Sequence, residues 1–209
     1  MSKPLKTFRD DYLDLLVRFL WREWTALGVA GRDTEPLRHM VDPEALLLFT
    51  CSIGRYDQRL FDEVLDWLVK NGRFINVQRL RNLLNAEAFQ GGDVLCAIAD
   101  WLARNGDPLK WNVLRRRVGK EQTSSSLFFL KNGRPMPASA KTDAIFIEHG
   151  FIRNPIAPRG YSSLFPNDTL PCHFLKMRAL FGVAARADIV TYLAANGTGH
   201  PREIAQELY

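Results

Sequence analysis

The sequence has few cysteines, and they lie far apart. Cys51, Cys96 and Cys172 are the only three in 209 residues, and none belongs to a Cys-x-x-Cys pair. This spacing excludes a disulfide-stapled scaffold and a zinc ribbon, and it is typical of proteins in a reducing compartment. We therefore expect a cytoplasmic protein.

Long apolar runs are lacking as well. The longest are short, such as Ala45 to Phe49, so the sequence predicts no membrane-spanning helix and no membrane partner. Residues 1–6 are polar and no apolar stretch follows them, which argues against a secretory signal.

Motifs for catalysis and for metal binding are missing too. The patterns GxxxxGK[ST], GxGxxG and GxSxG do not occur, and the four histidines form no HxH or HExxH pair. Cys172 and His173 are adjacent, but neighbouring side chains rarely reach one metal in regular structure, and metal ligation needs several convergent ligands. We expect no enzyme activity, no catalytic residues, no metal and no cofactor.

The composition is that of a globular protein, with 46% hydrophobic and 24% charged residues. Its charge is uneven along the chain. Residues 1–104 hold 14 Lys and Arg against 15 Asp and Glu, whereas residues 105–209 hold 14 against 8. The second half therefore carries a net charge of +6, which indicates either a phosphate-bearing partner or an ordinary solvated basic surface.

Periodicity predicts helices through the first half. The apolar residues from Phe8 to Leu27 recur mostly at steps of three and four, which predicts one buried face of an amphipathic helix. Asp42-Pro43-Glu44 has the residue types of a helix start, and the helix that follows is apolar nearly all round. We expect helices near 8–27, 43–54, 57–71, 76–85, 92–105, 109–118, 174–181, 184–195 and 201–208. The expected core comprises Leu46, Leu47, Phe49, Leu65, Leu68, Leu80, Leu95, Ile98, Leu102 and Leu114.

A short unit recurs in the chain. Residues 64–72 read VLDWLVKNG, residues 98–106 read IADWLARNG, and residues 189–197 read IVTYLAANG. Each predicts an amphipathic helix closed at Asn-Gly by a left-handed glycine. Two adjacent copies do not make a solenoid, so we interpret the unit as a helix-turn-helix used more than once.

The middle of the chain is rich in proline and serine. Residues 122–172 therefore predict an extended connector with at most one short hairpin, using Leu127 to Leu130 and Ala144 to Ile147 as candidate strands. Its aromatic residues indicate that it packs down and is not a loose linker. We divide the chain into a helical domain (1–121), this connector (122–172) and a C-terminal unit (173–209).

The C-terminal unit supplies the one family resemblance. The run PREIAQEL at 201–208 resembles the second helix of winged-helix and helix-turn-helix transcription regulators of the ArsR and MarR type, and ARADIVTYLAANG resembles the helix before it. The resemblance covers residues 174–209, and none is found for residues 1–172. It implies that Ala205 lies where two helices cross, with Ile204 and Leu208 beside it in the core.

The resemblance implies duplex DNA as the partner, with the N-terminal domain sensing a signal or mediating homodimerisation. In these regulators a recognition helix and a wing follow, but the sequence stops at Tyr209, so we expect a truncated chain whose specificity needs the missing part. The expected DNA contacts are Lys176, Arg178, His200, Arg202, Arg115, Arg116 and Arg117. The alternative interpretation of the basic run at 115–117, and the one we favour, is a solvated helix end. The alternative function is a helical protein–protein interaction module that does not bind DNA.

Overall fold

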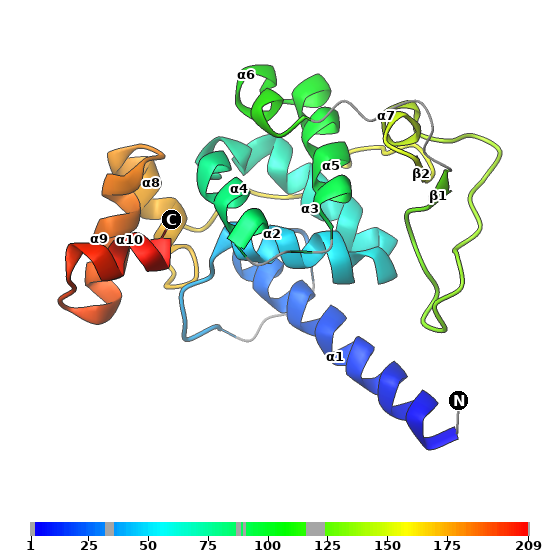
Figure 1. The fold of residues 1–209 in the computed structure, drawn as a ribbon, viewed down its shortest axis with the longest axis horizontal. Helices are drawn as coiled ribbons and strands as arrows, with labels where there is room; N and C mark the ends of the chain where they lie inside the picture. Colours follow the sequence, from blue (N-terminus) through cyan, green and yellow to red (C-terminus); the bar gives the residue numbers. More distant parts are fainter. Residues whose placement is uncertain (1–2, 32–35, 87–88, 90, 116–123, 209) are drawn as a thin grey trace.

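The computed structural model describes residues 3–31, 36–86, 89, 91–115 and 124–208 (Figure 1). Within these residues the protein is mainly helical, as predicted. The α-helices are α1 (Lys3–Ala26), α2 (Pro43–Ser52), α3 (Gln58–Asn71), α4 (Val77–Ala86), α5 (Gly92–Asn105), α6 (Pro108–Trp111), α7 (Ala144–Glu148), α8 (His173–Phe181), α9 (Ala185–Asn196) and α10 (Pro201–Leu208). Three 3-10 helices, η1 (Ile53–Tyr56), η2 (Gly72–Phe74) and η3 (Asn112–Leu114), follow α2, α3 and α6.

Side-chain caps explain where two of the first-half helices begin. The Asp42 carboxylate accepts hydrogen bonds from the backbone N–H groups of Glu44 and Ala45, and Pro43 occupies the first turn of α2. Asp57 caps α3 in the same way, through the N–H of Leu60. The predicted start at Asp42 is therefore confirmed.

The core lies between α1, α2, α3 and α5, with α2 near its centre (Figure 1). Trp24 and Trp67 meet edge-on with ring centroids 5.2 Å apart. The Trp24 indole donates to the Thr50 hydroxyl, and the Trp67 indole donates to the carbonyl of Leu27. Nine of the ten predicted core residues are buried; the exception is Phe49, which is half-buried.

The segment after residue 123 differs from the prediction in its secondary structure. Ala144 to Ile147 is not a strand but lies in α7, because Asp143 caps the N–H groups of Ile145 and Phe146. The only sheet in the described chain pairs β1 (Ser125–Ser126) with β2 (Phe151–Ile152) in parallel. Leu127 to Leu130 contributes a single antiparallel bridge, between Phe129 and Pro135.

This middle segment is nevertheless part of the helical core, as its aromatic residues indicate. Phe128, Phe146 and Phe151 are buried, and Phe61 of α3 meets both Phe128 and Phe146 edge-on. The Arg153 guanidinium lies among Phe61, Phe128 and Phe146, and it donates to Asp62 at 2.6 Å.

The Asn-Gly prediction holds for one of the three copies. Gly197 has a φ of 75°, which is the left-handed conformation that glycine adopts without a Cβ clash. Gly72 has a φ of −56° and continues directly into η2, while Gly106 has a φ of −142°. In these two copies the chain turns by other means, so the left-handed cap predicted there is wrong.

The apolar side of α1 is not one buried face. Leu13, Leu20, Trp24 and Leu27 are buried against the body of the protein, whereas Phe8, Tyr12, Leu15 and Phe19 are exposed. The apolar residues cover a wider part of the circumference of α1 than the other helices contact. In Figure 1 the N-terminal part of α1 projects beyond the other helices, so little of that part is covered.

The C-terminal helices also differ from the packing that the resemblance implies. Ile204 and Leu208 are buried as expected, but Ala205 is exposed and lies at no helix crossing. On α9 the buried residues are Ala187, Asp188 and Thr191, while the apolar Ile189 and Leu193 are exposed. Asp188 is held in this buried position by Arg178 of α8 and by the side-chain amide of Asn76, contacts that a leucine cannot make.

Candidate functional site

The most unusual surface of the protein is an apolar stripe along α1, made of Leu5, Phe8, Tyr12, Leu15 and Phe19. These side chains are 58%, 68%, 54%, 57% and 41% exposed. Isolated exposed apolar residues are ordinary, but a contiguous group on one helix marks a contact surface.

The spacing within the stripe is regular. The steps from Leu5 to Phe19 are three, four, three and four residues, which is the seven-residue repeat of a helix that pairs with another helix. Rings within the stripe are already ordered: Phe8 and Tyr12 stack with an interplanar angle of 6°. Phe19 meets Phe49 of α2 edge-on at 6.0 Å, so the stripe continues onto the body at its C-terminal end.

Charged residues flank the stripe on its solvent side. Asp11 and Arg18 are both exposed and lie seven residues apart, hence on the same side of α1. On the opposite side Arg9 and Leu16 are half-buried. One edge of the stripe is therefore charged and exposed to solvent, and the other edge faces the remaining helices of the protein.

The C-terminal half of α1 is firmly held, which gives the stripe a rigid base. Besides Trp24, the Trp21 indole donates to Asp57 at 2.8 Å, and Arg59 lies over the Trp21 ring. Asp14 pairs with Lys131 in the turn after β1. These contacts fix the direction in which the exposed residues of α1 point.

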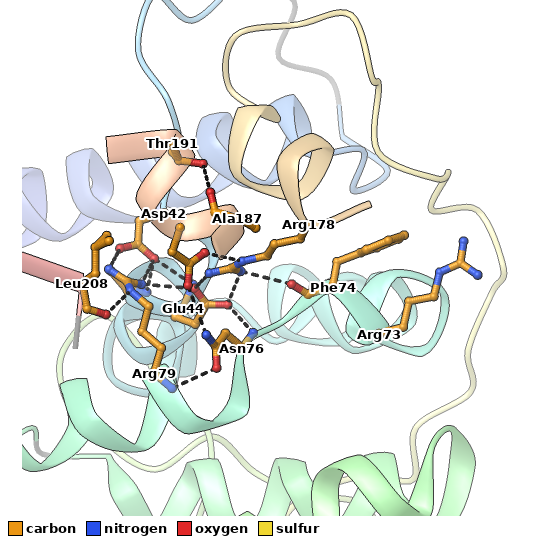
Figure 2. Close-up of polar contacts among 12 residues, drawn as sticks. Asp42, Glu44, Arg73, Phe74, Asn76, Arg79, Arg178, Ala187, Thr191 and Leu208 are labelled. Carbon is orange, nitrogen blue, oxygen red and sulfur yellow. Dashed lines mark hydrogen bonds and ion pairs between the residues drawn. The ribbon is translucent and has the colours of Figure 1, made fainter. Parts of the chain in front are cut away.

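A second distinctive feature is a buried ionic cluster between the first-half helices and α8 to α10 (Figure 2). The Arg178 side chain of α8 is fully buried and binds the equally buried Glu44 of α2 through two hydrogen bonds, of 2.6 and 2.9 Å. Its Nε donates to Asp188 of α9 at 2.9 Å. Although burial opposes the charge on Arg178, the two carboxylates outweigh it and raise the pKa of its guanidinium.

Arg79 of α4 completes the cluster. It donates to both carboxylate oxygens of Asp42, at 2.8 and 2.7 Å, to Glu44 at 3.1 Å, and to the carbonyl of Leu208 in α10. Asn76 adds its backbone N–H to Glu44 and its side-chain amide to Asp188. The cluster therefore joins three C-terminal helices to α2 and α4 through directional contacts.

A third group of charges surrounds Asp100 of α5. Its carboxylate accepts from His149 at 3.1 Å and pairs with Arg104 and Arg115. Burial alone raises the pKa of Asp100, but His149 and the two arginines more than offset this and lower it. This arrangement joins α5 to the end of α7 and to the residue after η3.

The predicted DNA contacts are not brought together as one surface. Arg178 is fully buried and committed to Glu44 and Asp188, so it presents no open guanidinium, whereas Arg115 pairs with Asp100 but remains exposed. Lys176, His200 and Arg202 are exposed on α8 and at the start of α10. Arg116 and Arg117 lie outside the described residues.

A cavity of about 190 Å³ lies beside α3, lined by Arg59, Asp62, Glu63, Asp66 and part of the segment 155–159. Most of its charges are used internally, since Asp62 binds Arg153 and Asp66 accepts from the N–H groups of Gly160 and Ser162. Glu63 is less well satisfied: its Oε1 lies 3.8 Å from Arg159, but its Oε2 is buried with no hydrogen-bond partner, and burial raises its pKa.

Two classes of site are not found among the described residues. None of their histidines, cysteines and carboxylates gather in a group of three or more that could hold a metal ion. No helix in that part of the chain combines the length and apolar character needed to cross a membrane.

Comparison with known proteins adds no family to this description. No family model matches the chain, and no curated protein or solved structure matches it either. The functional interpretation therefore depends on the residues themselves.

Phe8, Tyr12, Leu15 and Phe19 belong to the apolar face that periodicity predicts to be buried, and for these residues the prediction is wrong. Their alternation of three and four residues is compatible with a helix-pairing stripe and with a buried face alike. Leu13, Leu20 and Trp24 form a second apolar line on the same helix, which Leu27 continues just after the helix ends, and only that second line is buried.

Proposed function

We propose that this protein is a helical protein–protein interaction module that binds another helix through α1. The observation that carries the proposal is the exposed stripe from Leu5 to Phe19 with its three-four spacing. Burying such side chains in a helix pair is favourable by about 25 cal/mol for each Å² of apolar surface removed from water. The rigid base of α1 lowers the entropic cost of presenting them.

The rest of the chain serves, in this proposal, as the scaffold that aims α1. The ionic cluster around Glu44 joins the C-terminal helices to the body, and the tryptophans hold the C-terminal half of α1. A rigid body with one projecting amphipathic helix suits a docking function better than a catalytic one.

The proposal is tested by a photo-crosslinking amino acid placed at Leu15 in the full chain, in extracts of its source cells. A matched control carries it at Leu109, which is 86% exposed but lies outside the stripe. We expect a polypeptide adduct from position 15 and none from position 109. Equal adduct formation at both positions, or none at position 15, would refute the proposal.

Duplex DNA is the second candidate partner, because Lys176, His200 and Arg202 are exposed and the second half of the chain carries a net charge of +6. Phosphate contacts of this kind weaken steeply as salt rises. A salt titration of binding to a random duplex tests it, comparing the parent chain with a Lys176→Ala, Arg202→Ala variant. Binding that the variant leaves unchanged would remove this candidate.

A further inference from the structure

We infer that the helix bound by α1 is α1 of a second copy of this chain, running in the opposite direction. This inference rests on the proposed function and names its partner. It is drawn from the stripe together with the charges along its exposed edge.

The stripe complements itself when two copies are antiparallel. In the register that places Tyr12 opposite Leu15 of the second copy, Phe8 lies opposite Phe19, and the two-fold axis repeats both contacts. The projecting end of each α1 then lies against the anchored end of the other. There Phe19 already contacts Phe49, so the incoming Phe8 meets an aromatic surface that continues onto the body.

The flanking charges select this direction and register. In an antiparallel pair, residues on the same edge of the two stripes face each other, so Asp11 lies beside Arg18 of the second copy, and Arg18 beside its Asp11. Both pairs join opposite charges, and both residues are exposed. A parallel pair sets Asp11 near Leu16, Arg9 near Pro4 and Arg18 near Glu23. Glu23 is buried and bound by His39, so its carboxylate is not open to a second copy.

The body leaves room for this partner. The buried residues Leu13, Leu20 and Trp24 lie on a face of α1 turned about 100° or more away from the middle of the stripe, at 100° of helix rotation for each residue. The stripe spans only about four turns, or about 21 Å. We therefore expect a dimer that forms and dissociates with concentration, not an obligate one.

The test is sedimentation equilibrium of the full chain with charge reversals. Asp11→Arg and Arg18→Asp each place like charges opposite one another in the self-pair, so each alone should weaken dimerisation by about five-fold or more. Mixed with each other, the two variants regain both opposite-charge pairs, and the mixed dimer should form at least as tightly as the parent dimer. Arg186→Asp, an exposed reversal on α9, is the control and should dimerise like the parent.

Three results would overturn the inference, and circular dichroism of each variant shows that the fold is retained. If both variants and their mixture dimerise like the parent, the antiparallel contact is wrong. If the mixture stays as weak as its components, Asp11 and Arg18 do not face each other. A chain that remains monomeric up to its solubility limit has no second copy as partner. In that last case crosslinking at Leu15 decides separately whether α1 binds another protein, so the two proposals fail independently.

Discussion

Arg178 and Glu44 are 134 residues apart in the sequence, yet their fully buried side chains form a bidentate ion pair. This contact, with Asp188 and Arg79 beside it, joins the C-terminal helices to the first-half helices. Charges removed from water in this way are costly to separate, because either partner left alone is both buried and unpaired.

Replacing Arg178 by Ala should therefore destabilise the whole protein. It leaves Glu44 and Asp188 without their main partner, and the loss of a buried pair member costs about 3–5 kcal/mol of unfolding free energy. Urea unfolding measures this cost, and limited proteolysis tests whether α8 to α10 detach. Arg186→Ala, at an exposed position of α9, is the control and should change stability by less than about 0.5 kcal/mol. A cost below about 1 kcal/mol for Arg178→Ala would show that the cluster does not hold these helices.

The tryptophan-lined core should be sensitive to leucine truncation. Leu68 and Leu102 are buried on α3 and α5, so Leu68→Ala and Leu102→Ala should each cost about 2–5 kcal/mol. Val69→Ala is the matched control, since Val69 is adjacent to Leu68 but exposed on the outer face of α3. Equal losses at Leu68 and Val69 in chemical denaturation would mean that the face of α3 is misassigned.

Part of this fold can be predicted from the sequence alone. The starts at Asp42 and Asp57 and the core leucines follow from local capping and periodicity, which depend on neighbouring residues only. The partner of Arg178 could not be predicted in this way, because Glu44 is brought to it by the fold and not by spacing. The same holds for Ala144 to Ile147: an apolar run of four is compatible with a strand, and the Asp143 cap decides for a helix.

The prediction that the stripe residues of α1 are buried is wrong for a different reason. These residues satisfy the rule for a buried amphipathic face, and the sequence contains no measure of how much surface the body offers to them. Two apolar lines run along α1, and the fold covers the one at Leu13, Leu20 and Trp24. Only the three-dimensional structure separates the covered line from the uncovered one.

Glu63 predicts an acid-dependent change in stability. Burial raises the pKa of this carboxyl in the folded state above its unfolded value, so the folded protein holds the proton more tightly. The charged form therefore destabilises the fold above that raised pKa, and the penalty disappears as pH falls through it. We expect Glu63→Gln to stabilise the protein at pH 7, because it removes a buried charge whose protonation the fold favours.

Thermal melts of the parent and of Glu63→Gln at neutral and at acidic pH test this. The gain should shrink toward zero in acid, where the parent carboxyl is protonated. Glu207→Gln replaces an exposed carboxylate on α10 and should leave the melting midpoint nearly unchanged at pH 7. A Glu63→Gln variant that is less stable than the parent at pH 7 would mean that the charge is stabilised by contacts with Arg159 or Arg59.

The most direct test of the central claim is the mass of the Leu15→Glu variant in solution, measured by sedimentation velocity over a concentration series. Leu15 is exposed, so the variant should keep the circular dichroism and melting midpoint of the parent, yet remain monomeric where the parent forms dimers. Leu109→Glu, at an even more exposed leucine, should dimerise like the parent. Dimerisation of Leu15→Glu with the affinity of the parent would contradict the claim that α1 pairs through its stripe.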